Sequence, residues 1–188
     1  EILTLINREI DSAEGAIAML TASLENGDID VGTWEERLAE LIAATAALFF
    51  LLGIGGVATL TAQQQDTVRD ELTRQFDYLR RFSEGIMAGT MSAAGIAARA
   101  NLYISDAQLL YKQARDFAHP SGVFPYVSNR LGVAEHCPEC VAETNKGIVP
   151  RREMSFPGTR LCFVNCKCTL IYHKTRNDAD LLNRRDGW

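Results

Sequence analysis

Five cysteines lie in the last third of the chain, and their spacing is typical of a metal site. Two of them form Cys137-Pro-Glu-Cys140, and the other three follow a loop that turns at Pro157 and Gly158. A C-x-x-C turn brings two thiolates together, so that both can bind one metal ion at about 2.3 Å. A second group of cysteines can supply the remaining ligands. We therefore predict a structural Zn²⁺ site with the candidate ligands Cys137, Cys140, Cys162, Cys166 and Cys168.

Five cysteines are one more than a tetrahedral site needs. Alternate residues of an extended strand point to opposite faces, so Cys162 or Cys168 is a candidate for the spare thiol. Three histidines could replace a cysteine: His119, His173 and, least favoured because it adjoins Cys137, His136. Catalytic zinc is disfavoured because such sites keep an open position and carry His or carboxylate ligands.

Disulfides and free thiols are the alternative interpretations of these cysteines. Their number is odd, and no secretory signal is visible at the amino terminus. A chain of 188 residues can also build a core without covalent cross-links. Structural zinc is the interpretation that these observations favour.

The charge distribution argues against nucleic acid as the main partner. The formal net charge is −5, and residues 1–60 carry ten acidic and two basic side chains. Residues 119–188 carry ten basic and seven acidic side chains. Four thiolates with Zn²⁺ would add two negative charges to this last segment, which leaves little positive charge for phosphate groups.

No residue from Leu41 to Gln65 is charged, so length alone would allow a membrane-spanning helix. However, Gly53, Gly55 and Gly56 interrupt the run, and no basic cluster flanks it to set an orientation. We predict a buried core or interface helix here, and no membrane contact.

The amino-terminal segment has the pattern of an amphipathic helix with one narrow apolar seam. Gly27 is a natural end for this helix, and the segment Thr33 to Glu36 has the form of a capping box that opens a second helix. The seam could pack within the chain or form a coil between subunits. Its members are Leu3, Ile6, Ile10, Ala13, Ile17, Leu20 and Leu24.

Two further helices are predicted before residue 119. Thr61 and Gln64 match a capping box for the third helix, and Ser92 can cap the fourth. Beyond Pro120 the composition changes to Pro, Gly, Cys and short β-like runs, of which Thr169–Tyr172 is the best strand. The predicted fold is mainly α, with helical hairpins or a bundle of about four helices followed by a small β-rich zinc-knuckle lobe. The predicted parts are a helical body (1–118), a Cys-rich zinc-binding lobe (119–173) and a C-terminal arm (174–188).

Several segments together resemble the minor head proteins of tailed bacteriophages, the phage head morphogenesis family. The cysteine signature is the specific part: in that family a C-x-x-C pair precedes Asn-Cys-Arg-Cys and a short strand, and Cys137, Cys140, Cys166 and Cys168 occupy those positions. Lys167 stands where Arg is usual. The resemblance covers roughly residues 60–172, and its supporting segments are 75–82, 87–103, 136–140 and 165–168.

The resemblance implies a structural virion protein of low copy number that acts in head assembly near the portal or in early DNA delivery. Its partners would be the portal, the major capsid protein or the scaffold, within a larger assembly. Its location would be the virion head, and the host cytoplasm during assembly. We expect no enzymatic activity, since no G-x-S-x-G, H-E-x-x-H or H-x-E motif occurs.

The alternative function is a zinc-knuckle nucleic-acid-binding protein that contacts packaged DNA. Zinc ribbons and knuckles often bind nucleic acid, and several basic residues lie near the cysteines. Acidic residues are interspersed among them: Glu135, Glu139, Glu143 and Glu153. The basic residues are Arg130, Arg151, Arg152, Arg160, Lys167 and Lys174.

Overall fold

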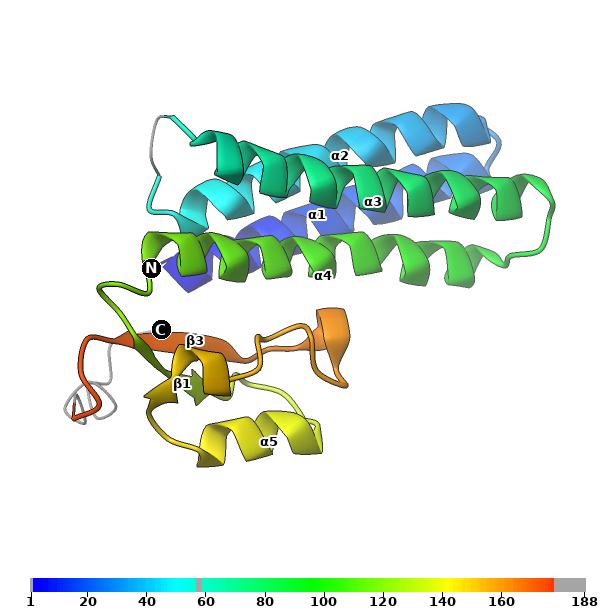
Figure 1. Cartoon of the computed structure of the whole chain (residues 1–188). Coiled ribbons are helices and arrows are strands. Elements are labelled where there is room, and N and C mark those ends of the chain that lie inside the picture. The colour runs from blue at the N-terminus through cyan, green and yellow to red at the C-terminus, as the bar shows by residue number, and fades with distance from the viewer. Residues whose placement is uncertain (1, 57–58, 178–188) are drawn as a thin grey trace.

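The computed structural model, which describes residues 2–56 and 59–177, has a layer of four long helices and a small lobe beneath it (Figure 1). The long helices are α1 (Ile2–Glu25), α2 (Val31–Gly53), α3 (Ala62–Met87) and α4 (Ala93–Ala118). The lobe contains β1 (Tyr126–Arg130), α5 (Pro138–Asn145), β2 (Val149–Pro150) and β3 (Thr169–His173), with short 3₁₀ turns η1 (Arg151–Glu153) and η2 (Phe163–Asn165). The predicted fold class is confirmed: a helical bundle precedes a small β-containing lobe.

The core of the bundle forms around α2, which packs against each of the other three long helices. Trp34 is fully buried and meets the ring of Phe82 on α3 edge-on, with 5.4 Å between ring centroids. The uncharged run supplies the buried Phe49 and Phe50. At Gly53, an added Cβ would lie 2.5 Å from the Cβ of Ala114, so the crossing of α2 and α4 requires glycine. None of the described helices is both long and apolar enough to cross a membrane.

The apolar seam of α1 faces the inside of the bundle. Ile6, Ala13 and Ile17 are buried, and Ile10 and Leu20 pack beside them. The seam therefore packs within the chain, and of the two interpretations left open by the sequence the intramolecular one is confirmed.

The helix ends follow the predicted capping chemistry with one exception. Thr61 and Gln64 form the reciprocal capping box of α3, and Ser92 Oγ accepts a hydrogen bond from Gly95 N at the start of α4. The prediction that Thr33 opens the second helix is wrong. Asp30 is the N-cap, because its carboxylate accepts a hydrogen bond from Thr33 N at 2.7 Å, so α2 starts at Val31.

The lobe is built on a three-stranded antiparallel sheet with the order β2-β1-β3. The predicted strand at Thr169–Tyr172 is confirmed and extends to His173. The sequence did not predict α5, which begins at Pro138 directly after its N-cap residue Cys137. A small apolar core covers the sheet and consists of Val127, Val149, Met154, Leu170 and Tyr172.

The lobe docks on the end of α4 through a group of polar and aromatic side chains. Tyr172 on β3 donates a hydrogen bond to Asp116 Oδ1 at 3.0 Å, and Arg151 forms an ion pair with the same carboxylate. His119 stacks on the Tyr172 ring with 4.3 Å between centroids. These contacts join the body to the lobe. The predicted division of the chain at residue 118 into separate folding units stays a prediction. Of the predicted arm, residues 178–188 lie outside the described residues.

A polar network is buried between α3 and α4. Asp106 Oδ2 accepts hydrogen bonds from Arg74 at 2.8 Å and from Gln75 at 3.3 Å, while Arg74 also pairs with Glu71. Asp106 Oδ1 has no hydrogen-bond partner among the described residues. Burial raises the pKa of Asp106 most, and the nearby negative charge of Glu71 raises it further. The positive charge of Arg74 lowers the pKa, but the net result is a value of about 6.

This raised pKa predicts that Asp106 affects stability in a pH-dependent way. The folded protein disfavours the ionised carboxylate, so ionisation of Asp106 lowers the free energy of unfolding above pH about 6. This loss of stability disappears as the pH falls toward the usual pKa of Asp. Since a neutral amide imitates the protonated carboxyl group, Asp106→Asn should gain stability relative to the wild type as pH rises from about 4 to about 7.5. Urea unfolding of both proteins across this range measures the difference. The control is Asp77→Asn, at an exposed position of α3, and a pH-independent difference for Asp106→Asn would contradict the account.

Candidate metal centre

All five cysteines converge at one end of the lobe, although they come from three separate segments. Cys137 and Cys140 stand at the start of α5, Cys162 and Cys166 flank η2, and Cys168 directly precedes β3. Cys140, Cys166 and Cys168 are buried, and Cys137 and Cys162 are half-buried. The sequence therefore identified the members of this cysteine cluster correctly as neighbours in space.

The sulfur atoms form two groups of three that share Cys140. In the first, Cys137, Cys140 and Cys162 have their sulfur atoms within 4.8 Å of one another, and in the second Cys140, Cys166 and Cys168 do. Cys140 Sγ lies 3.4 Å from Cys162 Sγ and 3.8 Å from Cys166 Sγ. In a tetrahedron with metal–sulfur bonds of about 2.3 Å, sulfur atoms are about 3.8 Å apart. The cluster could therefore hold a metal ion, and Cys140 is central to the arrangement.

Close backbone packing brings the last two cysteines under the loop that precedes α5. A Cβ added at Gly132 would lie 2.3 Å from the carbonyl oxygen of Lys167, the residue between Cys166 and Cys168. Only glycine allows this approach. The turn before it is also tight: Phe163 has a φ of 42°, and Cys166 N donates to Phe163 O at 3.0 Å. A non-glycine residue in this left-handed region is strained, and here the strain accompanies a turn that sets Cys162 and Cys166 on the same side.

The three candidate histidines have different surroundings. His136 Nδ1 is 4.0 Å from Cys168 Sγ, while its Nε2 lies 2.9 Å from the carbonyl oxygen of Gly132. His173 Nε2 is 2.8 Å from Ser128 Oγ, and His119 stacks on Tyr172. Neither of the two groups of sulfur ligands includes a histidine among the described residues. His136, least favoured from the sequence, is nonetheless beside the cluster.

The surroundings shift the pKa values of the thiols in opposite directions. A hydrogen bond from the main chain at Cys140 lowers the pKa of Cys137. Burial tends to raise the pKa of Cys166, but hydrogen bonding with the Cys168 main chain and the charge of Lys112 lower it overall. Burial raises the pKa of Cys162, and raises that of Cys168 to about 12. A bound metal ion would therefore have to displace protons, which makes binding depend on pH.

Two basic side chains contact the cluster and were not recognised as part of it from the sequence. Arg160 is only 2% exposed, and its Nη1 lies 3.7 Å from Cys140 Sγ. Lys112 on α4 donates a hydrogen bond to the carbonyl oxygen of Cys166. The assignment of Arg160 to a basic surface for nucleic acid is wrong, because the side chain points into the lobe. No sequence signal marks Lys112, which lies 54 residues before Cys166.

Comparison of the chain with protein-family models, with curated proteins and with solved structures finds no match in any of the three. The converging, largely buried cysteines could bind a metal ion that prefers soft sulfur ligands.

The contact at Gly132 gives a specific test of this geometry. Gly132→Ala should force the loop away from Lys167 and weaken metal binding, because the added methyl group meets backbone that cannot rotate away. Competition with a metal chelator measures the loss. Gly122→Ala is the matched control, since no atom lies within 4 Å of its added Cβ. Equal affinity in both variants would show that the close approach does not position the ligands.

A second test separates the lobe from the bundle. Cys137→Ser removes one candidate ligand and should destabilise residues 122–172. Amide hydrogen exchange in these residues should become faster by about tenfold or more, while α1–α4 keep their protection from exchange. Hydrogen exchange of the metal-treated protein, resolved by segment, measures this. Val141→Ser, at an exposed position of α5, is the control. Uniform loss of protection in all four long helices would instead mean that the two parts fold as one unit.

Proposed function

We propose that this chain is a structural protein of a tailed-phage head, a minor head protein, whose lobe is stabilised by one structural zinc ion. The helical bundle would contribute surface for packing against other head proteins. The zinc ion would hold α5, η2 and β3 together in a lobe whose apolar core is small. In this role the protein binds and positions partners, and no catalytic step is required of it.

The observation that carries the proposal is the convergence of the cysteine signature. Four of the five cysteines occupy the positions of the head morphogenesis pattern. Three of these four, Cys140, Cys166 and Cys168, have their sulfur atoms within 4.8 Å of one another, and Cys137 lies as close to Cys140 and Cys162. The donor set also fits zinc, because the cluster offers thiolates and buries three of them. These features support a structural zinc site better than a catalytic one, since the two groups of sulfur atoms include no carboxylate among the described residues.

Nucleic-acid binding by the lobe is less well supported. Of the basic residues that suggested it, Arg151 pairs with Asp116, Arg152 lies 3.9 Å from Glu153, and Arg160 is buried. Arg130, Arg152, Lys167 and Lys174 are exposed. Four exposed basic residues interspersed with acidic ones provide few phosphate contacts, so any DNA binding should be weak and should depend only shallowly on salt concentration.

The proposed role is tested by asking where the chain is found. Particles purified from cells that carry this sequence in a phage genome should contain the chain in DNA-filled heads, detectable by mass spectrometry at low copy number. Heads assembled without it should fail in assembly or in delivery of DNA. Its absence from purified particles, with infectivity unchanged after deletion, would overturn the proposal.

A further inference from the structure

Arg160 is a buried cation that has no carboxylate partner among the described residues. Its guanidinium donates to Asn129 Oδ1 at 2.9 Å and to Ser155 Oγ at 3.1 Å, both neutral groups. Within the part of the chain that the structure describes, the only anion-forming group in contact is the sulfur of Cys140, at 3.7 Å. A guanidinium does not lose its proton in proteins, and a buried charge is costly unless an opposite charge lies close by. The position of Arg160 therefore favours negative charge on the cysteine cluster.

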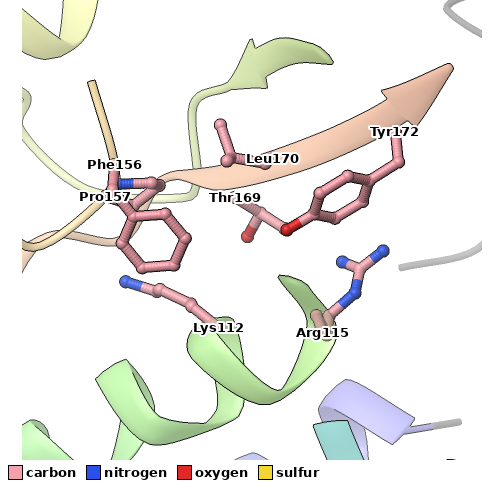
Figure 2. Close-up of a pocket in the computed structure, with 7 residues that line it drawn as sticks. All are labelled: Lys112, Arg115, Phe156, Pro157, Thr169, Leu170 and Tyr172. Carbon is pink, nitrogen blue, oxygen red and sulfur yellow. The ribbon is translucent and has the colours of Figure 1, made fainter. Parts of the chain in front are cut away.

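Lys112 is a second basic side chain that contacts a cysteine of the cluster, through the main chain of Cys166. Figure 2 shows its side chain rising from α4 toward the loop at Phe156 and Pro157, in the crevice between the bundle and the lobe. Its ammonium donates to the carbonyl oxygen of Cys166, and no ion pair with a carboxylate occurs among the described residues. The side chain is partly buried, so solvent screens its charge less than that of an exposed lysine.

The two cations match the charge of one particular metal complex. Four thiolates around one divalent ion carry two negative charges. Three thiolates with one divalent ion, or five thiolates with two, would carry only one. The other charged side chains nearby, Glu139 and Lys167, are exposed and are screened by water.

We propose that Lys112 and Arg160 are the counter-ions of a single divalent metal ion bound by four thiolates, while the fifth cysteine stays a neutral thiol. The inference rests on the proposed metal site and adds its charge, its stoichiometry and two residues that stabilise it. Arg160 and Lys112 are positioning residues that do not touch the metal. Their charges stabilise the anionic complex, and the hydrogen bond from Lys112 also ties the ligand loop to α4.

The test compares neutral and charge-retaining substitutions in the full-length chain. Zn²⁺ and Co²⁺ are the probes, and affinity is measured by competition with a chelator. Lys112→Met and Arg160→Met should each weaken binding by about tenfold or more, the usual size of an effect from residues around metal ligands. Lys112→Arg and Arg160→Lys keep the charge and should restore most of the affinity. Lys167→Met removes an exposed charge between two cysteines and should have a smaller effect than either neutral variant.

The visible and near-ultraviolet spectrum of the Co²⁺ complex provides a readout that a packing defect alone would not imitate. Its thiolate charge-transfer intensity should match four bound sulfurs in the wild type, with one Co²⁺ per chain. If Lys112→Met and Arg160→Met bind metal as tightly as the wild type, the counter-ion role is wrong and the metal site stands. Equal losses in the neutral and charge-retaining variants would also overturn it. A wild-type protein that binds no divalent metal would overturn both proposals.

Discussion

The close approach of the cysteine sulfurs is the constraint on which the lobe depends. Cys140 has neighbouring sulfur atoms at 3.4 and 3.8 Å, so thiolates at these distances need compensating positive charge. A metal ion at the centre and basic side chains around it would provide that charge. The apolar core of the lobe lies on the sheet and is small, so the cysteine segments are held by close backbone packing and polar contacts, such as Gly132 against Lys167 and Leu161 N donating to Glu139.

The helical bundle has a different source of stability and provides the surface on which the cysteine loop rests. Its core is a conventional apolar one, centred on Trp34 and the aromatic residues of α2 and α3. The lobe meets α4 through the Tyr172, Asp116 and Arg151 group at the end of the helix and through Lys112, which donates to the carbonyl oxygen of Cys166. Lys167 also donates to Gln108 at 3.3 Å, and Gly158 packs closely on Leu109. A change in the metal site should therefore alter the contacts at this junction first.

The features that the sequence predicted are those set by local patterns. The seam of α1 and the caps at Thr61 and Ser92 depend on residues three or four apart, and the cysteine spacing identified the cluster. The start of α2 was misplaced because Asp30 and Thr33 both have capping side chains, and only the structure shows which one caps the helix. Arg160 and Lys112 could not be assigned because their roles depend on tertiary contacts. Arg160 in particular had the same sequence signature as an exposed basic residue.

The central claim is that four of the five cysteines bind one metal ion, rather than forming disulfides or remaining unrelated thiols. The most direct measurement is elemental analysis of the purified chain, paired with a count of reactive thiols before and after chelation. The account predicts one zinc ion per chain, with one thiol reactive before chelation and four more afterward. Protein without metal and with fewer than five titratable thiols would mean that disulfides form instead, and would contradict the account.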